Sequence, residues 1–155
     1  MKMAVRAATA PLTARGDMND VDYSIQPIGF IRSPLVDLDA APRQGDEGAP
    51  DACIELTDAM APGLLGMRVG EELLVLTWLH LAERDVLQVH PRGAPGRRLT
   101  GVFTTRSPDR PNPIGLHRVS VLEIDGGRLR VAPMEAVDGT PVLDIKCVLT
   151  KVDER

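Results

Sequence analysis

Short apolar runs separated by glycine and proline dominate this sequence. Residues 24–33 and 53–57 alternate apolar and polar side chains, the period of a strand with one buried face. Residues 70–83 have a continuous apolar centre bounded by glycine, which is typical of a buried strand, and residues 85–91 form another strand-sized run. The first half of the chain therefore predicts four short strands.

The second half continues in the same way. Residues 102–107 and 138–149 predict further strands, and residues 116–125 and 128–136 predict a β-hairpin because two consecutive glycines join them. Six or more short strands with few helices favour an all-β fold, a single compact β-barrel.

A few residues refine this prediction. Gly29 inside the first strand indicates a bulge or a close backbone approach. Asp58 and Gly66 bound a short helical turn, so we expect one or two short helices. Residues 1–22 are small, polar and unpatterned and predict a disordered tail, which leaves residues 23–155 as a single barrel domain.

Composition narrows the class of protein. A chain of 155 residues fits one hydrophobic core, and its four aromatic residues are too few for a row of base-stacking side chains. The longest apolar run, Leu73–Leu81, is shorter than the roughly 18 residues of a membrane helix. Cys53 and Cys147 make no metal-binding spacing, so we expect reduced thiols, a cytoplasmic protein, and no membrane or metal partner.

The charge of −4 is unevenly distributed. Leu35–Glu72 is acidic, whereas the following segment carries a group of arginines. An arginine patch inside an acidic protein is suited to one local anionic site, and the alternative is that some arginines pair with the acidic half. The arginines are Arg84, Arg92, Arg97, Arg98, Arg106, Arg110 and Arg118.

Residues 106–115 contain three prolines within six residues. Proline fixes φ and removes a backbone donor, so this segment predicts a rigid turn that orients Arg106, Arg110 and Asn112. Arginine binds carboxylates and phosphates, and asparagine can bind an adenine edge. The alternative is a stiff surface turn.

Two carboxylates occur in residues 138–146. Asp138 lies at an Asp-Gly turn, and Asp144 follows six residues later, on the same face if the strand is regular. Such a pair could hold a cationic ligand or accept a proton. His80, His90 and His117 match no common metal signature; His80 is expected to contact a ligand. No dinucleotide fingerprint, P-loop or nucleophile elbow occurs.

Several motifs together resemble one family, the tRNA methyltransferase O family with its TsaA-like domain. The resemblance rests on residues 28–34, 42–45, 74–84, 89–93, 101–117 and 138–146, which cover most of the patterned chain.

The resemblance implies an S-adenosylmethionine-dependent methyltransferase: a homodimeric β-barrel that methylates N6 of threonylcarbamoyl-adenosine beside the tRNA anticodon. The implied cofactor contacts are Pro42, Arg43, Gln44, His80, Leu81, Arg106, Leu116, Asp138, Gly139, Thr140 and Pro141.

Within that framework we expect Arg106 and Asp138 to be catalytic and Arg110, Asn112 and Asp144 to bind substrate. Three alternatives stay open. They are a methyltransferase of the same fold that acts on a small molecule, a non-catalytic S-adenosylmethionine-binding regulatory module, and a metal-dependent hydrolase.

Overall fold

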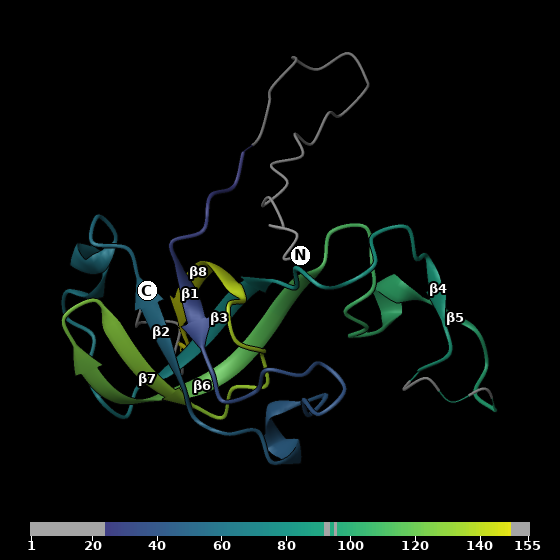
Figure 1. Ribbon diagram of the computed structural model, residues 1–155, viewed down its shortest axis with the longest axis horizontal. Helices are drawn as coiled ribbons and strands as arrows, with labels where there is room; N and C mark the ends of the chain where they lie inside the picture. The colour runs from purple at the N-terminus through teal and green to yellow at the C-terminus, as the bar shows by residue number, and fades with distance from the viewer. Residues whose placement is uncertain (1–23, 92–93, 95, 150–155) are drawn as a thin grey trace, which may run out of the picture.

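A computed structural model describes residues 24–91, 94 and 96–149 (Figure 1). The predicted disordered tail over residues 1–22 lies outside the described residues, as do residues 92–93, 95 and 150–155. The tail and the outer limits of the domain therefore stay predictions.

Six antiparallel strands close into a barrel in the order β1-β2-β7-β6-β3-β8. Pairing of β8 with β1 completes the ring, so each of the six strands has a hydrogen-bonded neighbour on both sides. The all-β prediction is confirmed. The strands are β1 (Gly29–Arg32), β2 (Ala52–Leu56), β3 (Glu72–Trp78), β6 (Ile114–Asp125), β7 (Arg128–Ala132) and β8 (Pro141–Cys147).

The barrel core is aliphatic, in keeping with the few aromatic residues. Inward side chains alternate with outward ones along β1, β3 and the first part of β6. The predicted hairpin is confirmed as β6–β7, with Gly126 at a φ of +57° in its turn. Fully buried members of the core are Ile31, Ile54, Leu73, Val75, Val119, Val121, Leu129, Val131, Met134 and Val142.

A small two-stranded sheet lies to the side of the barrel (Figure 1, right). It pairs β4 (Gln88–Val89) with β5 (Thr100–Gly101). The described helices are short 3₁₀ segments, and none of them has the length of a membrane span. They are η1 (Gly45–Glu47), η2 (Ala61–Leu64) and η4 (Val102–Thr104).

The predicted strand over residues 102–107 is wrong, because Val102–Thr104 is the 3₁₀ helix η4. Thr104 and Thr105 donate their hydroxyl protons to the carbonyls of Gly101 and Val102, each at 2.9 Å. These local hydrogen bonds compete with strand pairing, and threonine is prone to make them. The turn expected after Asp58 is present as η2, although it starts later, at Ala61.

Gly29 confirms the expected close approach. It lies opposite Leu56 of β2, and a Cβ atom at this position would overlap the Glu55 carbonyl. The obstacle is backbone inside the barrel wall, which cannot move aside as a flexible side chain does.

We therefore expect Gly29→Ala to lower the free energy of unfolding by about 1–3 kcal/mol, the usual cost of overpacking. Urea denaturation measures the change. Gly63→Ala is the matched control, since no heavy atom lies within 4 Å of a Cβ built there. Equal stability of the two variants would contradict the steric argument.

Candidate functional site

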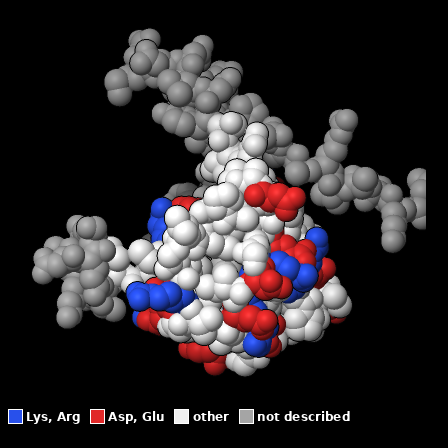
Figure 2. All heavy atoms as spheres, turned by 90° about the vertical axis from the view of Figure 1, so that its left-hand side faces the viewer, with Lys and Arg blue, Asp and Glu red and all other residues white. Residues whose placement is uncertain are grey.

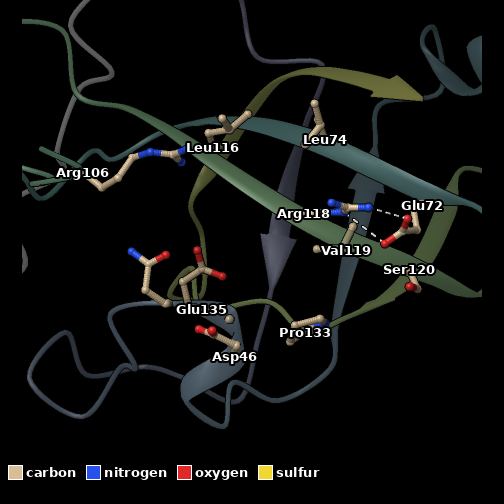
Figure 3. A pocket seen from close by; sticks show the side chains of 12 residues that line it. Asp46, Glu72, Leu74, Arg106, Leu116, Arg118, Val119, Ser120, Pro133 and Glu135 are labelled. Atoms are coloured by element: carbon tan, nitrogen blue, oxygen red, sulfur yellow. Dashed lines mark hydrogen bonds and ion pairs between the residues drawn. The ribbon is translucent and has the colours of Figure 1, made fainter. Parts of the chain in front are cut away.

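A cavity of about 470 Å³ lies on the outer side of the barrel, between β6 and the segments that contain η1 and Glu135 (Figure 3). Strands β3 and β6 supply its wall, mostly through their outward side chains. The lining residues are Gln44, Gly45, Asp46, Glu72, Leu74, Arg106, Leu116, Arg118, Val119, Ser120, Pro133 and Glu135.

Three residues that the sequence predicted as cofactor contacts meet in this cavity: Gln44, Arg106 and Leu116. Leu116 faces it because β6 alternates, so that its neighbours Gly115 and His117 point into the barrel. Gln44 precedes η1, and Arg106 follows η4. Segments separated by more than 60 residues thus converge on one space.

The cavity carries charges of both signs. Arg118 donates to both carboxylate oxygens of Glu72 at 3.0 and 2.7 Å, which lowers the pKa of Glu72. The arginine patch thus pairs in part with the acidic half, as the alternative interpretation proposed. Arg106, by contrast, has no hydrogen-bond or ion-pair partner among the described residues, so its guanidinium is available to a ligand.

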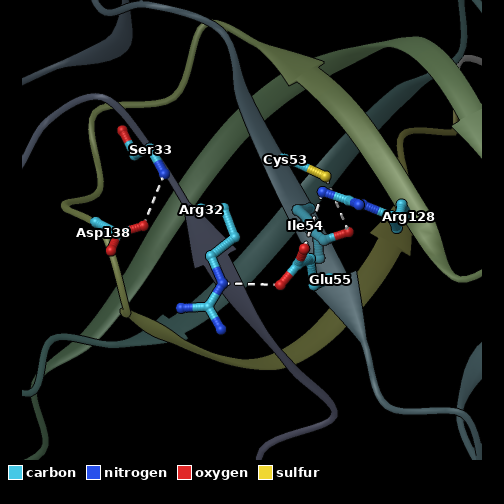
Figure 4. A network of polar contacts seen from close by, with 7 residues as sticks. All are labelled: Arg32, Ser33, Cys53, Ile54, Glu55, Arg128 and Asp138. Carbon is cyan, nitrogen blue, oxygen red and sulfur yellow. Dashed lines mark hydrogen bonds and ion pairs between the residues drawn. The ribbon is translucent and has the colours of Figure 1, made fainter.

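The other ion pairs also mix the two signs over the surface. Basic and acidic side chains lie side by side on the face in Figure 2 rather than in separate fields. On the outer face of β1, β2 and β7, Glu55 pairs with Arg32 at 2.8 Å and with Arg128 at 2.9 Å (Figure 4). The outer face of β1, β2 and β7 therefore has no large excess of positive charge.

A buried hydrogen-bonded chain runs from the barrel interior to the cavity. Nδ1 of His117 lies 2.7 Å from Oε1 of Glu135, and Nε2 lies 2.8 Å from Oγ1 of Thr77. These three residues were not predicted together as a site from the sequence. A usable signal was present, because His117 occupies an inward strand position between Gly115 and Val119.

The turn from Asp138 to Pro141 lies beside β1 and does not line the cavity. Asp138 accepts a hydrogen bond from the Ser33 amide at 3.0 Å (Figure 4), and the Gly139 amide donates to the Ile31 carbonyl at 2.8 Å. These contacts hold the turn against β1. A cofactor role for residues 138–141 stays a prediction.

Four further predicted contacts lie outside the lining. Pro42 and Arg43 directly precede Gln44 in the loop before η1. His80 and Leu81 follow β3, where the Leu79 amide donates to the Pro113 carbonyl at 2.8 Å. Their assignment to the cofactor also stays a prediction.

Arg110 is engaged within its own loop. Its guanidinium donates to the carbonyls of Val102, Thr105 and Ser107 at 2.7, 2.7 and 2.9 Å. This geometry favours a structural role, in which Arg110 holds the proline-rich segment in shape. Asn112 is exposed, and its backbone carbonyl accepts the Ile114 amide at 2.8 Å.

The expectation that Asp138 and Asp144 share one strand face is wrong. Strand β8 begins at Pro141, and its register with β3 shifts before Asp144, so the spacing does not follow regular alternation. Asp144 instead forms an ion pair with Lys146 at 2.7 Å.

The histidines lie in separate environments. His117 belongs to the buried chain, whereas Nδ1 of His90 lies 2.7 Å from the Arg97 carbonyl oxygen. Over residues 24–91, 94 and 96–149, no three His, Cys, Asp or Glu side chains gather closely enough to hold a metal ion.

The sequence profile of the tRNA-methyltransferase O N-terminal domain matches residues 30–154. This chain belongs to that family. The resemblance stated from the sequence is therefore confirmed.

Solved structures and sequence relatives agree with this membership. A crystal structure of TrmO from Pseudomonas aeruginosa matches with a TM-score of 0.66 at 31% identity, covering 86% of this chain and 60% of that one. An S-adenosyl-L-methionine-binding protein of Archaeoglobus fulgidus is 43% identical over 83% of this chain and 91% of its own length.

Two more comparisons give similar values. A protein of Methanothermobacter thermautotrophicus, named as a probable S-adenosyl-L-methionine-binding protein, is 43% identical over 88% of this chain and 97% of its own. Another crystal structure of TrmO matches with a TM-score of 0.67 at 33% identity, covering 86% of this chain and 62% of that one. The chain thus spans about three-fifths of the solved TrmO chains.

The half-buried His80 gives a pH-dependent prediction. Burial lowers the pKa of the His80 imidazole from the ordinary 6.5. The imidazole therefore binds a proton more readily in the unfolded chain than in the folded one. The contribution of neutral His80 to stability is fully present above its unfolded pKa of about 6.5 and is lost as the pH decreases toward the lower pKa of the folded state. We expect the thermal midpoint to drop between about pH 7.5 and 5.5, and to drop less in His80→Gln. Identical pH slopes for the two proteins would contradict this.

Proposed function

We propose that this protein binds S-adenosylmethionine in the cavity beside β6 and transfers its methyl group to tRNA. Family membership supports the reaction class, and the names of the curated relatives support the cofactor. The observation that carries the proposal is the meeting of Gln44, Arg106 and Leu116 in one cavity.

The chemistry of the cavity fits this cofactor. Its volume of about 470 Å³ lies within the range of small-molecule sites, roughly 300–1,000 Å³. Leu74 and Leu116 offer apolar surface to a ring system, and Gln44 offers an amide that both donates and accepts. Arg106 offers a guanidinium to the cofactor's carboxylate.

S-adenosylmethionine supplies an electrophilic methyl group on a positively charged sulfur. The protein's part is to align that methyl group with the nucleophile, and well-aligned reactants reach effective molarities of order 10⁵ M or more. We assign Arg106 to the carboxylate of the cofactor or the substrate. For Asp138 we retain cofactor orientation or proton acceptance, with one carboxylate oxygen already bound to the Ser33 amide.

The finer proposal concerns the substrate. From the family resemblance we propose N6-methylation of threonylcarbamoyl-adenosine beside the anticodon. Its nitrogen is conjugated to a carbonyl, so a cation near the carbonyl oxygen would stabilise the charge that develops there. Asn112 and Asp144 remain proposed substrate contacts, whereas the three carbonyl contacts of Arg110 favour support of the loop. The cytoplasmic location stays a prediction from sequence.

One observation favours a second candidate function. The curated relatives are named for S-adenosylmethionine binding and not for methyl transfer. A non-catalytic binding module would bind the cofactor and transfer no methyl group to any substrate. A methyltransferase acting on a small molecule would transfer it without binding tRNA.

We expect Arg106→Ala to weaken S-adenosylmethionine binding by about tenfold or more, because it removes a charged hydrogen-bond donor. Isothermal titration calorimetry measures the affinity. Arg130→Ala is the control, since Arg130 lies on β7, outside the cavity, and pairs with Asp51 and Glu123.

Mass spectrometry of tRNA nucleosides from cells that lack the protein tests the proposed substrate. Persistence of methylated threonylcarbamoyl-adenosine in those cells would reject it.

We also propose a homodimer, from the family resemblance and from an apolar strip on the barrel. The strand register sets Leu116 beside Leu76 and Ile114 beside Trp78, all on the outer face of β3 and β6. Leu116 is 43% exposed and Ile114 39% exposed. A second copy of the chain would cover the Ile114 and Trp78 end of this strip, outside the cavity, and remove its apolar surface from water.

Ile114→Glu should therefore shift the mass in analytical ultracentrifugation from dimer towards monomer, because a charge would be buried in an apolar interface. Leu65→Glu is the control at an exposed leucine next to η2, outside the strip. A wild-type monomer, or an unchanged dimer in Ile114→Glu, would contradict the proposed interface.

A further inference from the structure

The chain of Thr77, His117 and Glu135 connects the barrel core to the cavity. Thr77 is fully buried, the His117 side chain is 4% exposed, and the Glu135 side chain is 17% exposed. Only Glu135 lines the cavity, where Figure 3 shows it opposite β6. The three residues come from β3, β6 and the segment between β7 and β8.

The donor and acceptor roles in this chain can be assigned from its chemistry. An ionised carboxylate only accepts, so Nδ1–H of His117 donates to Oε1 of Glu135. In a neutral ring the other nitrogen then accepts, and the Thr77 hydroxyl donates to Nε2. Both ring nitrogens of His117 and the Thr77 hydroxyl have a partner in this arrangement, and the ring orientation is fixed at both ends.

Gly115 provides the space for this arrangement. A Cβ atom at Gly115 would overlap Oγ1 of Thr77 and lie 2.7 Å from Nε2 of His117. The inward glycine therefore leaves room for the imidazole and the hydroxyl to meet. Leu116 lies between Gly115 and His117 on β6, so the alternation of the strand turns its side chain outward into the cavity.

The hydrogen bonds from hydroxyl to imidazole to carboxylate resemble those of a hydrolytic triad, but Thr77 cannot act as a nucleophile. Its hydroxyl lies inside the barrel and no substrate reaches it. In a hydrolytic triad the hydroxyl meets the substrate. In the Thr77–His117–Glu135 group the hydroxyl is the buried support, and the Glu135 carboxylate at the cavity is the group that can meet a ligand.

No lysine or arginine of the described residues forms an ion pair with Glu135. Among the described residues its only ion-pair or hydrogen-bond partner is His117, whereas Glu72 in the same cavity is paired with Arg118. A partly buried carboxylate without a cation favours a positively charged ligand. Arg106, on the other side of the space, favours a negative group, so the cavity suits a zwitterion (Figure 3).

We propose that Glu135 binds the cationic part of the ligand and that His117, supported by Thr77, is the positioning residue for Glu135. The proposal rests on the proposed function, because S-adenosylmethionine carries two cationic groups, the sulfonium and the α-ammonium. S-adenosylhomocysteine keeps the ammonium but has a neutral sulfur, so the two ligands together distinguish the groups.

Glu135→Gln removes the charge and keeps the shape. Calorimetric titration of the full chain should show about tenfold weaker binding of S-adenosylmethionine. A smaller loss for S-adenosylhomocysteine assigns Glu135 to the sulfonium, and an equal loss assigns it to the ammonium; both support the proposal. Glu123→Gln is the matched control, a paired surface carboxylate on β6, and should bind both ligands as the wild type does.

The positioning role is tested at His117. His117→Leu removes the donor to Glu135 and should reproduce the binding loss of Glu135→Gln, whereas His117→Asn keeps a donor near the Nδ1 position and should restore most of the affinity. Thermal melting reports whether each variant is folded. If His117→Leu does not fold, Thr77→Val removes only the far hydrogen bond and should show a partial loss.

Two results separate the possible failures. Wild-type protein that does not bind S-adenosylmethionine would overturn both the proposed function and this inference. Wild-type protein that binds it, together with unchanged affinities in folded Glu135→Gln, would overturn the inference alone. Equal affinities in His117→Leu and the wild type would reject the positioning role.

Discussion

The two-residue alternation of β6 within a closed barrel is the constraint on which the rest of this structure depends. Inward positions supply Gly115, His117 and Val119, and outward positions supply Leu116 and Arg118. One strand thereby contributes to the core, the buried hydrogen-bonded chain and the cavity wall. A shift of one residue in its register with β3 would exchange these roles and place apolar core residues in water.

Closure of the barrel sets the other half of the site. Because β8 returns to β1, the turn before β8 is held against the end of β1 through Asp138 and Gly139. The segment that contains Glu135 precedes that turn, and Pro133 and Glu135 lie close to Gly45 of η1. The cavity is thus built where two long connections pass over a rigid wall, a common arrangement for binding sites.

Much of the fold could be predicted because it depends on local pattern. The β6–β7 hairpin followed from two glycines between alternating segments, and the close approach at Gly29 from a glycine within a strand. The segment after Gly101 could not be predicted in this way. Its threonines suit a strand, but their hydroxyls and Arg110 bind the local carbonyls, so η4 forms instead.

By itself, the sequence determined the aliphatic all-β barrel and the family, because strand periodicity and motif residues are local properties. That Gln44, Arg106 and Leu116 line one cavity depends on the fold. Only the tertiary structure decided that Glu72 is neutralised by Arg118 while Glu135 is held by His117. Those contacts depend on which strands and connections become neighbours when the ring closes, and residue order alone does not specify which carboxylate meets a cation.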